Sequence, residues 1–259
     1  QKDLQSSLNY CQGVIEKRST LPILSNVLIE AKDENLKITA TDLDLIFIQN
    51  ISNIEISEEG ETTTSCSIMY DIVRKFNNEK KINFNLVSEN KINLESDKSS
   101  FNLNCLKASE FPITEANFRE NEFSLNSKKL LKLLNKCKFS VSNDETRHYL
   151  SGIFLHLTEK ENKNFLTAVA TDSHRMGISK TLLSEEIKFE PIILPKKTIF
   201  QLCALLDDYD GNVKISNVKS KIKFEFNNTI LMSKLIDGKF PNYFQVIPKD
   251  NQKKLEIDL

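Results

Sequence analysis

The residues of this chain best suited to chemistry are Asp172, His174 and Arg175, which follow the apolar run FLTAVAT. Residues two apart on a β-strand project from the same face, so a strand here would set Asp172 beside His174. An Asp-x-His pair can form half of a metal site, or a general base with its orienting carboxylate. The other histidines, His148 and His156, stand at no zinc-like spacing from this pair. We therefore expect no metal and no cofactor.

An earlier segment repeats only part of this motif, because Ala40 to Asp42 matches Ala170 to Asp172 while Asp44 stands in the place of His174. A Thr-Asp pair shared by two segments is typical of a strand end, where the Asp side chain closes a turn on backbone N–H groups. The chain has no Gly-rich phosphate loop, no G-x-S-x-G and no H-E-x-x-H. We expect no catalytic residue, and a catalytic centre built on the Asp-x-His-Arg sequence is the competing hypothesis.

The partial match belongs to a repeat that runs through the whole chain. Near the start, Leu4, Leu8 and Cys11 match Leu130, Leu134 and Cys137, which lie 126 positions later. Further on, Met69, Ile72 and Phe76 match Ile199, Leu202 and Leu206 at an offset of 130. Finally, Phe111-Pro112 matches Phe240-Pro241 at an offset of 129. The four extra residues fall in a polar run where a hairpin turn tolerates insertion. A period of this length indicates one compact domain per repeat. We predict domains over residues 1–118, without an opening strand, and 119–248, with a third beginning in 249–259.

Composition excludes several classes of protein. The formal net charge is −1, from 35 basic and 36 acidic residues, which argues against a protein coated in basic charge. No apolar run approaches the length of a membrane span and no secretory signal opens the chain, so we expect a cytoplasmic protein without membrane contact. The five cysteines are widely spaced and odd in number, which predicts neither a disulfide framework nor a zinc knuckle.

Each unit mixes helical and strand patterns. Apolar spacing predicts helices over Leu4 to Ile15, ending near Lys17 to Ser19, and over Ser65 to Phe76. Alternating or apolar runs predict strands: Leu21 to Ala31 entered through Pro22, Leu36 to Ile48, Ile82 to Val87, Ile92 to Leu94, Phe101 to Leu106 and Glu122 to Asn126. Hairpin-length connections favour an α+β fold with antiparallel sheets. Ala108 to Glu122 is the predicted linker.

The segment Ser127 to Lys138 predicts a helix with two unlike faces. Four apolar residues share one side, and four lysines share the other: Leu130, Leu133, Leu134 and Cys137 against Lys128, Lys129, Lys132 and Lys136. Lysines on a rigid face attract a polyanion without reading its sequence. A solvated helix surface accounts for the same pattern.

The loop after this helix places Arg147 beside His148 and Tyr149. Such a group can contact phosphate and stack on unpaired bases, although Tyr149 could equally pack inward from a strand. Arg18 lies in the matching loop of the first unit, so both units present a basic residue here.

Five motifs, in order along the chain, resemble the bacterial sliding clamp family, the beta subunit of DNA polymerase III. They are Thr20 to Asn26 (TLPILSN), Ala40 to Asp44 (ATDLD), Thr146 to Gly152 (TRHYLSG), Ala170 to Met176 (ATDSHRM) and Leu235 to Tyr243 (LIDGKFPNY). The resemblance implies tandem clamp domains of two helices and antiparallel sheets, joined in a ring-forming head-to-tail homodimer around double-stranded DNA. It implies a processivity factor with no catalytic activity of its own. This factor would tether DNA polymerase III, the clamp loader and other proteins that carry a clamp-binding motif to the DNA.

The resemblance also assigns residues. Family DNA contacts correspond to Arg18, His148 and Tyr149, in addition to Lys129, Lys132, Lys136 and Arg147 from the patterns above. The family's peptide pocket corresponds to Leu150, Thr171, Ser173, His174, Arg175, Met176, Pro241, Gln245 and Val246. Ser173 replaces the usual Gly, Met176 the usual Leu, and Gln245 a frequently basic residue. Phe101 and Leu103 correspond to the dimer interface, and their alternating spacing equally fits a strand core.

Overall fold

The structure of the chain is a computed structural model that describes residues 2–18, 20–76, 81–113, 118, 122–248, 253 and 256. The first unit contains helices α1 (Lys2–Gln12) and α2 (Cys66–Val73), with strands β1 (Asn26–Lys32), β2 (Asn35–Thr41), β3 (Leu45–Ser52), β4 (Gly60–Ser65), β5 (Asn83–Ser88), β6 (Lys91–Ser96) and β7 (Ser99–Leu106). The second unit contains helices α3 (Ser127–Asn135) and α4 (Lys196–Leu206), with strands β8 (Glu122–Asn126), β9 (Gly152–Lys160), β10 (Lys163–Thr171), β11 (Met176–Leu182), β12 (Ile192–Pro195), β13 (Asn212–Val218), β14 (Lys221–Phe226) and β15 (Thr229–Lys234).

Short 3-10 helices complete both units: η1 (Pro22–Ser25), η2 (Ala108–Glu110), η3 (Lys138–Ser140), η4 (Glu145–Leu150) and η5 (Tyr243–Val246). The α-helices and strands of the first unit recur in the same order in the second, so α1 corresponds to α3, α2 to α4, β3 to β11 and β7 to β15. This confirms the repeat and the α+β fold. The predicted domain boundary falls among residues 114–121, of which only Phe118 is described, and it is buried.

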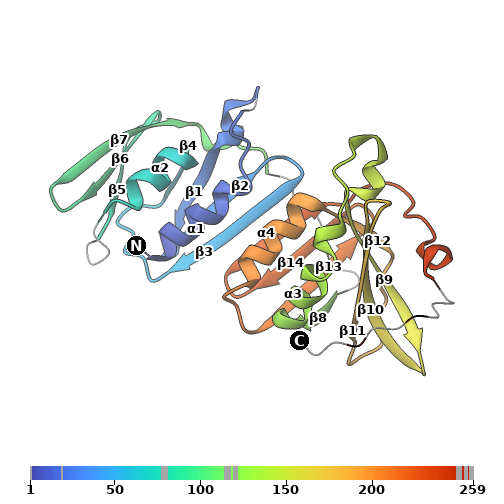
Figure 1. Cartoon of the computed structure of the whole chain (residues 1–259). Helices are drawn as coiled ribbons and strands as arrows, with labels where there is room; N and C mark the ends of the chain where they lie inside the picture. Colours follow the sequence, from blue (N-terminus) through green and yellow to red (C-terminus); the bar gives the residue numbers. More distant parts are fainter. Residues whose placement is uncertain are drawn as a thin grey trace.

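Every strand pairing between the described residues is antiparallel, and one pairing joins the two units. The larger sheet runs β5-β6-β7-β4-β1-β2-β3-β15-β14-β13-β8, and the smaller runs β11-β10-β9-β12. Strand β3 of the first unit pairs with β15 of the second, with Phe47 opposite Leu231 and Ile46 opposite Met232. The two units therefore share a continuous sheet (Figure 1).

The four helices lie in a row on one side of the sheets, in the order α2, α1, α4, α3 (Figure 1). Helices α1 and α4 meet in the middle of this row. There Gln201 Nε2 on α4 donates a hydrogen bond to the carbonyl oxygen of Tyr10 on α1, at 2.9 Å. Each helix buries its apolar stripe against its own sheets, where Leu8, Met69, Leu134 and Leu202 are fully buried. The outward faces of the row consequently form one surface.

The four extra residues of the second unit lengthen the two strands of its first hairpin and not the turn between them. The first hairpin turns through Asp33 and Glu34 and the second through Glu161 and Asn162, all with φ between 49° and 59°. Both are two-residue turns of the kind that match strand twist. Strands β9 and β10 have 9 residues each, whereas β1 and β2 have 7 each, which accounts for the four extra residues.

Several predicted boundaries are wrong: the run Leu36 to Ile48 is two strands separated by a turn, and the helix predicted over Ser127 to Lys138 ends at Asn135. Two further boundaries differ for a local reason. Helix α1 ends at Gln12, well before Lys17, because Gly13 follows it and α4 approaches so closely that a Cβ on Gly13 would lie 2.3 Å from Gln201 Oε1. The segment from Pro22 to Ser25 is a 3-10 helix and not the start of a strand, because proline presets the φ of a first helical position.

All five cysteines are free and buried, and a buried free cysteine packs as a small apolar residue. Cys11 and Cys137 occupy matching helix positions, and burial raises the pKa of Cys137 to about 12. None of the helices in the described ranges combines the length and the apolar character that crossing a membrane requires.

Candidate nucleic-acid and peptide interfaces

Helix α3 has the two unlike faces that its sequence predicts. Asn126 caps it, since its Oδ1 accepts hydrogen bonds from the backbone N–H groups of Lys128 and Lys129. Its apolar side is buried, and its lysine face, Lys128, Lys129, Lys132 and Lys136, is exposed. Lys128 forms an ion pair with Asp210 at 2.5 Å, whereas the other three have no ion-pair partner among the described residues. Three uncompensated ammonium groups therefore project from one helical face.

The start of α4 adds two lysines that the sequence reasoning did not identify. Lys196 donates a hydrogen bond to Asn143 Oδ1. Lys197 donates to the carbonyl oxygen of Val14 at 2.7 Å and to the Asp42 carboxylate at 2.6 Å, both in the first unit. The available signal was the Lys-Lys pair that follows Pro195, just before the residues that repeat the apolar spacing of Met69 and Ile72. Lys196 lies beside the loop of η4, and Lys197 fastens the two units together.

The loop around Arg147 and His148, which is predicted to contact DNA, is held by hydrogen bonds to two other segments of the chain. Arg147 donates from Nε to Asp144 at 2.8 Å and from Nη1 to the hydroxyl of Ser173 at 2.7 Å. The hydroxyl of Thr146, the side chain of Arg147 and the backbone N–H of Thr146 all donate to the Asp144 carboxylate and lower its pKa to about 2. The Nε2–H of His148, which is exposed, donates to the carbonyl oxygen of Asp237 at 3.0 Å. The loop and the turn at Ser173 are thus directly connected.

Tyr149 is partly buried and packs against an apolar cluster, which favours the inward-packing interpretation of its ring. It lies on the 3-10 helix η4 and not on a strand. Its ring meets that of His148 edge to face, with centroids 5.8 Å apart. Arg18 is exposed in the loop that follows α1.

Asp172 and His174 lie in a tight turn between β10 and β11, so the prediction of a strand here is wrong. Ser173 has φ of 76°, a left-handed conformation that favours glycine. Asp172 Oδ1 accepts from the backbone N–H groups of His174 and Arg175, each at 3.0 Å, and its Oδ2 accepts from the Arg175 side chain at 3.0 Å. These bonds lower the pKa of Asp172 to about 2, and both oxygens serve the turn.

The first unit builds the same turn. Leu43 has φ of 80°, and Asp42 Oδ1 accepts from the backbone N–H groups of Asp44 and Leu45 at 3.0 and 2.7 Å. The backbone N–H groups of Leu43 and Ser173 each donate to the preceding threonine hydroxyl, at 3.0 and 3.1 Å. The expectation that the shared Thr-Asp closes a turn is therefore confirmed.

Two of the predicted pocket residues meet in the apolar cluster. Leu150 at the end of η4 is buried with Val169, Ile193, Phe240 and Tyr243, and Met176 at the start of β11 packs against them. The remaining pocket residues surround this cluster at the surface. Thr171 borders it on the turn, His174 and Arg175 are exposed there, and Pro241, Gln245 and Val246 are exposed on the segment around η5. The structure thus places Leu150 and Met176 in an apolar cluster and leaves the polar residues His174, Arg175 and Gln245 exposed.

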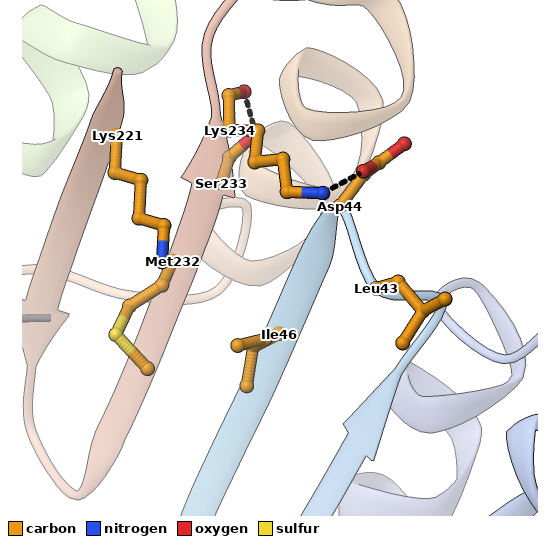
Figure 2. Close-up of a pocket in the computed structure, with 7 residues that line it drawn as sticks. All are labelled: Leu43, Asp44, Ile46, Lys221, Met232, Ser233 and Lys234. Carbon is orange, nitrogen blue, oxygen red and sulfur yellow. Dashed lines mark hydrogen bonds and ion pairs between the residues drawn. The ribbon is translucent and has the colours of Figure 1, made fainter. Parts of the chain in front are cut away.

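The junction of the two units shows how a following unit meets this kind of turn. Leu43, Asp44 and Ile46, which correspond to Ser173, His174 and Met176, line a small hollow together with Met232 and Lys234 on β15 (Figure 2). Lys234 Nζ pairs with Asp44 at 2.7 Å, and its backbone N–H donates to the carbonyl oxygen of Asp44 at 2.8 Å. The hollow that remains measures about 10 Å³, room for a single water molecule.

The predicted interface residues on β7 differ in exposure. Phe101 is 41% exposed and its ring packs on Phe76 at 5.8 Å, whereas Leu103 is 6% exposed and belongs to the core. Their strand corresponds to β15, which pairs with β3 along its outer edge. Over residues 99–104, β7 pairs with β6 alone among the described strands. No group of three potential metal ligands occurs in the described part of the chain.

Comparison with known proteins places this architecture in a family. The model of the DNA polymerase III beta subunit, N-terminal domain, matches residues 1–115, and that of its central domain matches residues 124–242. The beta sliding clamp of Caulobacter vibrioides is 34% identical over 257 residues, which are 98% of this chain and 69% of the relative. The beta sliding clamp of Escherichia coli is 31% identical and is covered to 68%.

Solved structures agree with these matches. A Caulobacter crescentus beta sliding clamp superposes with a TM-score of 0.92 at 33% identity, covering 96% of this chain and 67% of that one. A Bartonella birtlesii sliding clamp bound to griselimycin superposes with a TM-score of 0.90 at 34% identity, covering 95% and 66%. The chain spans about two thirds of the length of these relatives. With its repeated units, joined sheet and shared turns, the chain belongs to the family of bacterial beta sliding clamps, the beta subunit of DNA polymerase III.

Proposed function

We propose that this chain forms the first two domains of a sliding clamp that encircles duplex DNA and tethers DNA polymerase III without chemistry of its own. The row of helices carries the proposal, because it presents one continuous surface with an uncompensated lysine face (Figure 1). A sheet that runs unbroken through β3 and β15 stiffens the arc behind it. Such a surface holds a duplex by its phosphates and does not read its sequence.

The duplex lies against Lys129, Lys132 and Lys136, which have no ion-pair partner among the described residues. Arg18 and His148 add contacts from the two loops beside the helices. Arg147 positions the second loop, and Tyr149 supports the His148 ring edge to face. Because the overall charge is only −1, the proposed binding depends on where the charges lie rather than on their sum.

Ring closure uses the two strand edges at the ends of the arc. Strand β11 pairs only with β10 among the described strands, although its counterpart β3 pairs with β15. Strand β7 offers the edge that corresponds to β15. Units related head to tail satisfy both edges by the pairing seen at the internal junction, and the exposed ring of Phe101 packs at that contact. Leu103 supports the strand from the core.

Polymerase, clamp loader and other partners bind through a short peptide that enters the pocket beside the Thr171 turn. Leu150 and Met176 form its floor, and His174 and Arg175 its polar edge. Thr171, Ser173, Pro241, Gln245 and Val246 complete the rim. At the internal junction the following unit closes the matching hollow with Lys234 and Met232, so we expect the pocket to be completed by a following unit as well.

The geometry does not favour the catalytic alternative. Both carboxylate oxygens of Asp172 accept hydrogen bonds within its own turn. Its low pKa also makes Asp172 a poor general base at neutral pH. A clamp acting in the cytoplasm on replicating DNA accounts for the same residues.

The test of the proposal is topological. The chain is joined to the part of the Caulobacter relative that it leaves uncovered, its oligomeric state is measured by light scattering, and its retention is measured on nicked circular DNA before and after linearisation. A closed dimer retained on circles and lost from cut ends is the expected result. A dimer bound equally to circular and linear DNA, and released only by salt, would refute the clamp.

A further inference from the structure

Two exposed phenylalanine rings lie in the second unit beside the lysine face of α3. Phe139 on η3 is 54% exposed, and Phe200 on α4 is 47% exposed. Helix α4 contacts η3 directly. Burying a phenylalanine ring is favourable, and rings exposed on two elements in contact form the kind of apolar patch that marks a binding surface.

Cationic groups lie against both rings. The Nζ atoms of Lys138 and Lys196 lie 5.7 and 5.9 Å from the centre of the Phe200 ring, and Cζ of Arg175 lies 5.6 Å from that of Phe139. We name these five residues the aromatic-cation patch. At these distances each cation interacts with the ring it faces. The first unit has no such patch, because Gln12 and Gly13 stand in the places of Lys138 and Phe139.

Two of the three cations are held in place by other residues. Lys196 donates to Asn143, and Arg175 Nε donates to Asp172 at 3.0 Å. A guanidinium bound on one side to a carboxylate keeps other N–H donors for a second oxyanion. The patch therefore combines flat apolar faces with fixed donors for anions.

The patch continues surfaces already described. Lys136 links it to the lysine face of α3, and Arg175 links it to the turn that borders the peptide pocket. A duplex touching this region would use only the cations, because its bases are stacked and hide their flat faces. An unpaired strand presents phosphates and free base faces together, which is the combination that aromatic rings among cations recognise.

We propose that the aromatic-cation patch binds an unpaired stretch of a DNA strand by stacking bases on Phe139 and Phe200 while Lys138, Lys196 and Arg175 hold the phosphates. The site goes beyond duplex encirclement and needs no closed ring. It would let a clamp contact the single-stranded template next to a primer end.

The experiment uses the whole chain and three labelled probes of equal length: oligothymidylate, an abasic oligonucleotide with the same phosphates, and a blunt duplex. Binding is measured by fluorescence anisotropy at constant salt. Oligothymidylate is expected to bind about a hundredfold more tightly than the abasic probe, because stacking contributes roughly tenfold for each of the two rings. Equal binding of the two single strands would overturn the proposal.

Variants then locate the stacking. Phe139→Ala and Phe200→Ala are each expected to weaken oligothymidylate binding about tenfold and to change abasic and duplex binding less than twofold. Phe200→Leu keeps an apolar side chain and should weaken binding as much as Phe200→Ala. Phe244→Ala, at another 52% exposed ring, is the matched control and should have no effect. Retained binding in Phe200→Leu, or unchanged binding in both alanine variants, would refute stacking, and duplex binding reports separately on the clamp surface.

A spectroscopic readout is available because the chain contains no tryptophan. Phe200→Trp places a single indole on the patch. Its fluorescence should be quenched by oligothymidylate and stay unchanged with the abasic probe at saturation. Quenching by both probes alike would show that phosphates alone occupy the patch and would refute base stacking.

Discussion

The lysine face of α3 makes a quantitative prediction about duplex binding. Lys129, Lys132 and Lys136 are exposed and have no ion-pair partner in the described part of the chain, whereas Lys128 is paired with Asp210. Each lysine that neutralises a phosphate releases condensed counterions, and the slope of log K against log salt steepens by about 0.9 for each phosphate contact. Replacing the three free lysines by glutamine should therefore reduce that slope by about 2.7.

Glutamine keeps the helix propensity of lysine and removes only the charge, so the helix should stay intact. The assay is anisotropy with a labelled blunt duplex over a series of potassium chloride concentrations. Lys128→Gln is the matched control, and it should change the slope by clearly less than a free lysine does, because its ammonium already has a carboxylate partner at 2.5 Å.

Two results would refute this reasoning. An unchanged slope in the triple variant would mean that the lysine face of α3 is only a solvated surface. An effect of Lys128→Gln as large as that of Lys132→Gln would mean that the ion pair with Asp210 does not decide which lysines meet phosphates. Circular dichroism of each variant establishes that the helix content is retained.

Three further predictions concern stability. Lys197→Ala should lower the free energy of unfolding by about 1–3 kcal/mol in urea denaturation, because it deprives Asp42 and the Val14 carbonyl of a charged donor, while Lys81→Ala at an exposed pair should cost less than about 1 kcal/mol. Gly177→Ala should cost about 1–3 kcal/mol, since its Cβ would lie 2.9 Å from the Lys136 carbonyl oxygen, and Gly60→Ala, with open space around it, should be near neutral. Asp172→Asn should reduce thermal stability at pH 7. Because folding lowers the pKa of Asp172 from 3.8 to about 2, the stability it contributes is present above pH 4 and is lost as the pH falls toward 2, so the melting temperatures of variant and wild type should converge there. A constant difference down to pH 2 would contradict that assignment.

Local chemistry made several features predictable. The period of the leucines and lysines in α3 defines which side is buried, whatever the rest of the fold does. The Thr-Asp pair closes its turn with hydrogen bonds to residues at most four positions away, so the repeat alone identified it as structural. The strand prediction for Asp172 and His174 failed because one residue between them, Ser173, adopts a left-handed conformation that no alternation pattern reveals.

The functional surfaces were less predictable. Leu103 and Phe101 have equivalent positions in the alternating pattern, yet one is in the core and the other is exposed on a strand edge. Lys197 lies in an unremarkable Lys-Lys pair, but its ammonium joins two units because Asp42 lies 155 positions away in the chain. Neither the different exposure of Phe101 and Leu103 nor the ion pair of Lys197 is determined by residues nearby in the sequence.

The sequence by itself determined the repeat, the helix faces, the turns and the family motifs, because each depends on spacing and on contacts within a few residues. Only the tertiary structure decided how Arg147 connects the loop to Ser173, how β15 closes the junction at Asp44, and how Phe139 and Phe200 come to lie among cations. These contacts join residues far apart in the chain. Their geometry follows from strand register and helix packing, which no local pattern specifies.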